Sequence, residues 1–513
     1  MTQNRRIILN VIATYGRTMF SIVCGLFTVR WVLMVLGHED FGVYGVVGSM
    51  AIFVVFLNTQ LSEALARFYA VSIGSVKASN NASDAIEDCR AWFSCGVAIH
   101  LAVPLVLVLI GYPIGIYALE HGWLTVPSSK LNTCIWLWRF SCISSFVSMM
   151  NSPFQAMYIA KQNIAELTIY TFAQTTVRTV FIYAMTVIPG DWLFGYGLGM
   201  CLIAMAPQIL ICWRAFRVFD ECRLRRSALF DLSRIRKIAS FAWWKMFSGI
   251  GYIARHQCLE IVVNRHFGPK ANAAYTVAAT FGVEAASLTG ALNGAFSPVI
   301  ATAYGEGRMD YMRKMAMRSC KFGTLLTLMF AIPMFLEANE ILRLWLKNPP
   351  DNAVPMCEVL LGVVVIEKLT SGHYMAVSAV GDIRGLMIWR GLTCLLAIPA
   401  ALLAIWLVPT VVSVPVALLA TTVVVAFSDV YYARAKASMG VWSWITKVII
   451  PIVVLILACV GTGSLVVAAL QESFLRVCVT TLACLVVFIP MVWMLLLNAE
   501  ERQFLVNRVR RRR

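Results

Sequence analysis

Long apolar stretches, interrupted by short polar breaks, follow one another along the whole chain. Most of them exceed the roughly 20 residues that an α-helix needs to cross the hydrocarbon core of a bilayer. They fall at about 8–34, 43–66, 91–118, 131–160, 164–187, 193–213, 239–262, 273–303, 319–338, 355–379, 386–407, 411–432, 448–469 and 475–497. This pattern predicts an all-α polytopic membrane protein with about 14 transmembrane helices.

The composition leaves no room for a soluble domain. Of the 513 residues, 60% are hydrophobic and 13% are charged, whereas soluble globular proteins average about 45–50% apolar and about 25% charged residues. The loops are short, so an aqueous α/β or β enzyme domain is excluded. The 15 cysteines are scattered and form no CxxC pair or Cys/His cluster, so neither a metal nor another cofactor is predicted.

Basic residues are distributed unequally between the two sides of the predicted helices. Lys and Arg number 43 against 26 Asp and Glu, a formal net charge of +17. About 29 of the basic residues lie in one set of alternate loops and about 6 in the other set, and cytoplasmic loops are the ones that carry such an excess. Since the number of helices is even, both termini are predicted to be cytoplasmic. The run from Arg510 to Arg513 is then a solvated tail beside anionic lipid rather than a nucleic-acid site.

A basic segment divides the chain into two related parts. The predicted organisation is an N-terminal lobe (1–213), a cytoplasmic linker (214–238), a C-terminal lobe (239–432), two further helices (433–497) and a basic tail (498–513). Gly37 and Tyr44 follow the first helix at the spacing at which Gly268 and Tyr275 follow the seventh, and the helices after them end in RFYA at 67–70 and ATAY at 301–304. Such weak internal symmetry is typical of transporters, and it predicts two pseudo-symmetric lobes of six helices around a central cavity.

About eight basic residues fall inside the predicted helices, where each costs about 2.5–3.5 kcal/mol at the bilayer centre unless it lines a cavity or has a partner. Arg390 lies near a cytoplasmic end and is expected to snorkel. Lys368 is adjacent to Glu367, so local neutralisation and a functional role are equally open. The others form a ladder of positive charge at different depths: Arg17, Arg30, Arg139, Arg178, Lys245 and Arg255. Because Arg and Lys bind phosphate through charge-assisted hydrogen bonds, the ladder indicates an anionic cargo.

The seventh predicted helix carries a polar stripe. Lys245, Tyr252, His256 and Glu260 lie on one face at 100° per residue, so Tyr252 and His256 are expected to line the cavity. The acidic candidates for ion coupling are Glu63, Glu260, Glu284 and Asp429. The membrane potential acting on a charged cargo is an equally open source of energy.

Several motifs resemble the polysaccharide and O-antigen flippases of the multidrug/oligosaccharidyl-lipid/polysaccharide exporter superfamily. The first two helices carry TVRWVL at 28–33 and LGHEDFGVY at 36–44, and a second patch reads NRHFGPKANAAY at 264–275. Smaller matches are PFQA at 153–156, SPVI at 297–300, YGEG at 304–307, ILRLWL at 341–346 and GDIR at 381–384. These are packing and turn signatures, so they specify the superfamily better than the substrate.

The resemblance implies a transporter and no enzyme. Proteins of this family carry an undecaprenyl-diphosphate-linked oligosaccharide, the repeat unit of an O-antigen or exopolysaccharide, from the cytoplasmic to the periplasmic leaflet of the bacterial inner membrane by alternating access. Their basic cavity residues lie mainly in the first and seventh helices, which here correspond to Arg17, Lys245 and Arg255. The implied partners are the lipid-linked oligosaccharide, membrane lipids, a glycan polymerase and a chain-length regulator, with no nucleic acid.

Two alternatives remain open. A multidrug or cation antiporter of the same superfamily predicts that buried acidic residues dominate the interior, whereas the interior charge here is cationic. A membrane glycan polymerase or ligase predicts a long outward loop or a cluster of His and acidic residues, and neither is present in the sequence.

Overall fold

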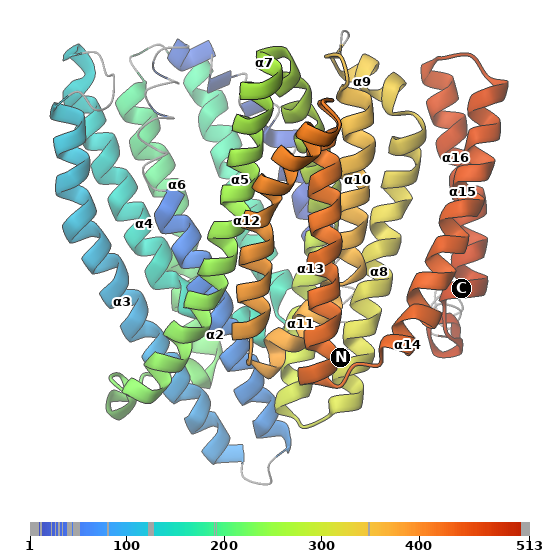
Figure 1. Ribbon diagram of the computed structural model, residues 1–513. Helices are drawn as coiled ribbons and strands as arrows, with labels where there is room; N and C mark the ends of the chain where they lie inside the picture. The colour runs from blue at the N-terminus through green and yellow to red at the C-terminus, as the bar shows by residue number, and fades with distance from the viewer. Residues whose placement is uncertain are drawn as a thin grey trace, which may run out of the picture. The chain divides into compact units, whose positions relative to one another are not determined.

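The computed structural model describes residues 10, 13–21, 23–25, 27–28, 31–32, 34–37, 40, 44, 52–78, 82–121, 128–188, 190, 192–346 and 349–503. Within these residues helix is the only regular secondary structure, and no β-strand occurs. Long helices make up nearly all of the described chain (Figure 1). The all-α prediction is therefore confirmed.

The chain divides into two compact units. Unit 1 comprises Met1–Met246 and Ala301–Arg308, and unit 2 comprises Phe247–Ile300 and Met309–Arg513. Unit 1 contains α2 (Ile52–Ala78), α3 (Ala82–Glu120), α4 (Leu131–Ala160), α5 (Ile164–Val187), α6 (Leu193–Val218) and both ends of α7 (Leu232–Gly305). Unit 2 contains the middle of α7 together with α8 (Met309–Leu336), α9 (Ala338–Leu346), α10 (Ala353–Leu369), α11 (Ser371–Val380), α12 (Arg384–Leu407), α13 (Ser413–Ala437), α14 (Val441–Trp444), α15 (Ile450–Ala469) and α16 (Phe474–Met491).

The length of the apolar stretches predicts several helices closely. The bounds of α4 and α5 coincide with the stretches at 131–160 and 164–187. The stretches at 239–262 and 273–303 both lie in α7 and are separated by a kink at Gly268, whose φ and ψ angles of 83° and 178° are not helical. Two helices therefore meet there, as the two apolar stretches predict. The stretch at 355–379 is divided at Thr370, which lies between the end of α10 and the start of α11. The hydroxyl of Thr370 donates to Asp429 at 3.0 Å.

Seven of the described helices are long and apolar enough to cross a membrane. They are Ile86–Glu120, Leu193–Val218, Met309–Leu336, Arg384–Leu407, Ser413–Ala437, Val441–Ala469 and Phe474–Leu496. Several expose large apolar side chains along their length, as Leu457 and Leu482 do at 67% and 62%, and such faces are stable in contact with lipid. The chain is therefore a multi-pass membrane protein, while the count of fourteen and the side of each terminus stay predictions.

The basic segment 214–238 is attached to α3 within unit 1. Arg90 Nε donates to the carbonyl of Asp220 at 3.0 Å, and the amide of Arg225 donates to Ser94 Oγ at 2.8 Å. Asp231 caps the start of α7 by accepting from the amides of Ser233 and Arg234, and these hydrogen bonds lower the pKa of its carboxyl. The segment therefore has a fixed path over the end of α3.

The internal echo of the sequence has a counterpart in the backbone. Gly37 and Gly268 hold φ angles of +73° and +83°, values that side chains with a Cβ rarely adopt. Each glycine therefore holds a positive φ angle in its own unit. The segments that follow the second sequence match, near 71–74 and 302–305, pack closely against each other within unit 1. A Cβ on Gly74 would lie 2.1 Å from the carbonyl oxygen of Thr302, and a Cβ on Gly305 would lie 2.0 Å from the carbonyl oxygen of Val71.

We expect Gly74→Ala to destabilise the protein by about 1–3 kcal/mol, because the atoms that the new methyl group meets are backbone atoms and cannot turn aside. Gly111→Ala is the matched control, since nothing lies within 4 Å of a Cβ at that position of α3. The measurement is thermal unfolding of the detergent-purified protein followed by tryptophan fluorescence. Equal melting temperatures for the two variants would contradict the close approach of α2 to the end of α7.

Candidate functional site

Arg255 is the most deeply buried cation of the predicted ladder. Its side chain on α7 is 3% exposed, its Nη2 lies 3.7 Å from Glu367 Oε1, and its guanidinium lies 4.8 Å from the ring centre of Tyr252. Its Nε has no hydrogen-bond partner among the described residues. An unsatisfied donor of this kind is unusual in a buried site, so Arg255 is prepared to donate to a ligand.

A second ion pair lies in the same unit. Arg390 Nη1 on α12 donates to both carboxylate oxygens of Asp429 on α13, at 2.9 and 3.1 Å, and Asp429 is 3% exposed. The guanidinium also lies 4.6 Å from the ring centre of Tyr374. A buried carboxylate therefore holds Arg390, whose side chain is 27% exposed, and the expectation that it snorkels stays a prediction.

Glu367 links these two pairs. It contacts Arg255 and also interacts electrostatically with Arg390 and Asp429. The question left open for Glu367 and Lys368 is thus answered in part, since Glu367 reaches beyond its neighbour to another helix. We call Tyr252, Arg255, His256, Glu367, Arg390 and Asp429 the polar cluster of unit 2.

Two further polar groups near Arg255 are unsatisfied. The rings of Tyr252 and His256 lie 4.6 Å apart, as their spacing on one face of α7 predicts. The Nε2 of His256 and the hydroxyl of Tyr275 are buried without a hydrogen-bond partner among the described residues. Glu260 interacts electrostatically with Tyr275, and the side chain of Glu284 lies outside the described part of the chain.

Lys245 belongs to unit 1, where it forms an ion pair with Glu63 on α2. Lys245 is 9% exposed and Glu63 is 52% exposed. The ammonium also lies 5.8 Å from the ring centre of Phe241. One of the acidic candidates for ion coupling is therefore the direct partner of one of the predicted cargo-binding cations.

The remaining cations of the ladder have different surroundings. Arg139 donates through Nε to the hydroxyl of Tyr112 at 3.0 Å and lies over the ring of Trp136. Arg178 has a buried Nε without a partner among the described residues, and it interacts electrostatically with Tyr44 and Tyr196. Arg17 is partly buried and has no ion pair in the described ranges, and Arg30 lies outside them.

The polar cluster of unit 2 contains unsatisfied groups of the kind that accept an anion as partner. No group of three or more His, Cys, Asp or Glu side chains is placed to hold a metal ion in the part of the chain that the structure describes. The groups left unsatisfied are the Nε of Arg255, the Nε2 of His256 and the hydroxyl of Tyr275, and all three suit phosphate or hydroxyl oxygens as partners. The sequence identifies Glu367 and Arg390 as charged residues inside apolar stretches, but it does not predict that Glu367 meets Arg255 or that Arg390 meets Asp429.

The sequence matches two known family models. Residues 7–303, more than half of the chain, match the model of the family described as polysaccharide biosynthesis protein. The chain belongs to this family. Residues 257–403 of this polysaccharide biosynthesis protein also match the MatE family model. No curated protein matches the chain in sequence.

Solved structures show the same fold for the polysaccharide biosynthesis protein. A MATE structure in the bent conformation is 15% identical with a TM-score of 0.72, and the match covers 85% of this chain and 96% of that one. An outward-facing multidrug resistance MATE transporter is 14% identical with a TM-score of 0.70, and the match covers 85% of this chain and 96% of that one. A transporter of the same superfamily from Pyrococcus furiosus is 13% identical with a TM-score of 0.65, and the match again covers 85% of this chain and 96% of that one. The resemblance found in the sequence is confirmed: this is a transporter of the multidrug/oligosaccharidyl-lipid/polysaccharide exporter superfamily.

Proposed function

We propose that this protein moves a polyprenyl-diphosphate-linked oligosaccharide, the repeat unit of an O-antigen or exopolysaccharide, from the cytoplasmic to the periplasmic leaflet of the bacterial inner membrane. The observation that carries the proposal is Arg255, a buried guanidinium with an unsatisfied Nε, in a chain of the polysaccharide biosynthesis protein family. A diphosphate offers several charged acceptor oxygens, and Arg recognises such groups through paired hydrogen bonds.

The other cations fit the same proposal. Arg178 has a buried Nε that is free to donate, in a separate unit from Arg255. Each unit thus contains a buried arginine with a donor available to an anionic group. Fourteen helices with both termini in the cytoplasm, and an association with a glycan polymerase and a chain-length regulator, belong to this proposal.

Export of multidrug or cationic compounds is the second candidate. It is favoured by the MatE family match at 257–403 and by the fold shared with MATE structures. Such cargo needs buried carboxylates that are free to bind a cation. In the described part of unit 2 the buried carboxylate of Asp429 is already occupied by Arg390 and Thr370, which favours the anionic cargo.

Ligand-induced thermal stabilisation distinguishes these two proposals. We expect a polyprenyl diphosphate at about 100 times its Kd to stabilise the purified protein by about 2.7 kcal/mol, seen as a higher melting temperature. The matched control is the polyprenyl alcohol of the same chain length, which lacks the diphosphate. Stabilisation by ethidium and none by the diphosphate would favour the multidrug candidate instead.

A further inference from the structure

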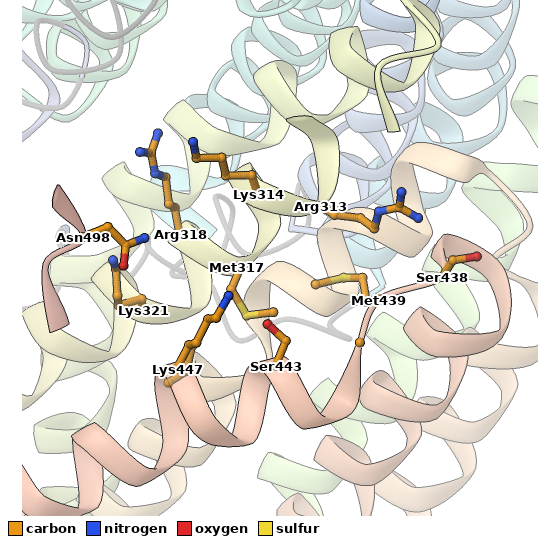
Figure 2. Close-up of a pocket in the computed structure, with 12 residues that line it drawn as sticks. Arg313, Lys314, Met317, Arg318, Lys321, Ser438, Met439, Ser443, Lys447 and Asn498 are labelled. Carbon is orange, nitrogen blue, oxygen red and sulfur yellow. The ribbon is translucent and has the colours of Figure 1, made fainter. Parts of the chain in front are cut away.

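A basic pocket of about 400 Å³ lies in unit 2, away from the polar cluster. Basic side chains from two directions line it: four come from the first turns of α8 and one from the π-helical turn after α14. They are Arg313, Lys314, Arg318, Lys321 and Lys447. Ser443 and Asn498 add hydrogen-bonding groups to the wall. Figure 2 shows Lys447 extending from its helix towards α8, with Ser443 beside it.

The pocket lies at the level where four candidate membrane spans begin or end. The spans Met309–Leu336 and Val441–Ala469 begin here, and the spans Ser413–Ala437 and Phe474–Leu496 end here. The positive-inside prediction places this level at the cytoplasmic surface. Trp442, beside the pocket, is 74% exposed, as is common for tryptophan among lipid headgroups. The pocket therefore lies at headgroup depth.

The charges around the pocket do not balance. Arg313 pairs with Asp310 at 2.6 Å, Lys314 pairs with Glu500 at 2.5 Å, and Arg318 and Lys321 share Glu501 at 2.9 and 2.6 Å. Lys447 is exposed and has no ion pair within the described residues. Five cations thus face three carboxylates, and two positive charges remain.

The carboxylates also fix the C-terminal segment beside the pocket. Burial raises the pKa of Glu501, but hydrogen bonds from Lys321 and from the amide of Asn498 outweigh it and leave that pKa below its ordinary value. Lys321 also donates to the carbonyl of Leu496 at 3.0 Å. The wall of the pocket is therefore held in place at neutral pH, and the excess of positive charge is permanent.

From this arrangement we propose that the pocket binds the phosphodiester headgroup of an anionic membrane phospholipid. Clustered Lys and Arg at a membrane surface attract anionic headgroups, and the hydroxyl of Ser443 and the amide of Asn498 suit the remaining phosphate and glycerol oxygens. A lipid is favoured over soluble phosphate because α15 starts at this level and exposes Ile450, Val453 and Leu457, an apolar flank for acyl chains. The site is separate from the cargo and does not rest on the proposed function.

Native mass spectrometry of the detergent-purified full-length protein tests the proposal. Lys447→Gln removes the cation without an ion pair, and we expect it to weaken binding of dioleoyl-phosphatidylglycerol about fivefold. Lys237→Gln removes an equally exposed charge at the start of α7, outside the pocket, and is expected to leave binding unchanged. Glu500→Gln, which adds one net positive charge at the pocket, is expected to tighten binding.

Three results would overturn the lipid assignment. The first is the same loss of phosphatidylglycerol from the Lys447→Gln and Lys237→Gln variants. The second is equal binding of phosphatidylcholine, which carries no net charge. The third is complete displacement of phosphatidylglycerol by inorganic phosphate at equal concentration, which would assign the pocket to a soluble anion. None of these measurements involves the transported cargo. A result that overturns the lipid site therefore leaves the proposed function untouched.

Discussion

Replacing Arg255 with alanine is expected to lower the rate of lipid-linked oligosaccharide translocation about 10- to 100-fold, because hydrogen bonds to a charged group contribute about 1.5–3 kcal/mol each. The fold should persist, since the partner that remains, Glu367, is 29% exposed and can be hydrated. Arg255→Lys keeps the charge but loses the planar pair of donors, so it should give an intermediate rate. The measurement is transport of a fluorescent polyprenyl-diphosphate disaccharide in proteoliposomes.

The matched control for Arg255 is Arg265→Ala. Arg265 lies ten residues further along the same helical run, is exposed, and has no ion pair among the described residues. This variant should transport at the wild-type rate. Wild-type transport by the Arg255→Ala variant would remove Arg255 from the cargo site.

Loss of Arg390 is expected to have the largest effect on stability. In Arg390→Ala the carboxylate of Asp429 stays buried with the hydroxyl of Thr370 as its only described donor, and breaking a buried pair costs about 3–5 kcal/mol. Asp429→Ala should cost less, because Arg390 is 27% exposed and can reach water. Thermal unfolding of both variants tests this order.

Two controls show whether the loss of stability comes from leaving a buried charge without its partner. In the double variant Arg390→Met with Asp429→Leu, apolar side chains replace both charges, and most of the stability should return. Lys436→Ala breaks the exposed pair with Asp382 near the end of α13 and should leave the melting temperature unchanged. If Arg390→Ala unfolds at the wild-type temperature, the ion pair does not hold α12 to α13.

The sequence allows most helices to be predicted, because the length of an apolar run is a local property. The bounds of α4 and α5 follow from such local signals. The break in α7 at Gly268 is likewise predicted by the polar residues around it. The packing of residues 301–308 against α2 in unit 1 could not be predicted in this way.

The sequence predicts which cations belong to the candidate site but not which acidic residues they pair with. A cation inside an apolar stretch identifies Arg255 and Lys245 from the sequence alone. Their partners, Glu367 and Glu63, lie on other helices far away in the chain. Which acid meets which cation depends on how the helices pack, so the balance of charge in the interior becomes visible only in three dimensions.

The most direct test of the proposed function compares translocation of the cargo in liposomes with and without the purified protein. Liposomes with a fluorescent polyprenyl-diphosphate oligosaccharide in both leaflets are treated with a membrane-impermeant quencher, with and without the purified protein. We expect quenching beyond the outer-leaflet half only when the protein is present, and less of it when unlabelled polyprenyl diphosphate competes. No additional quenching, together with protein-dependent export of ethidium from the same liposomes, would contradict an anionic lipid-linked cargo.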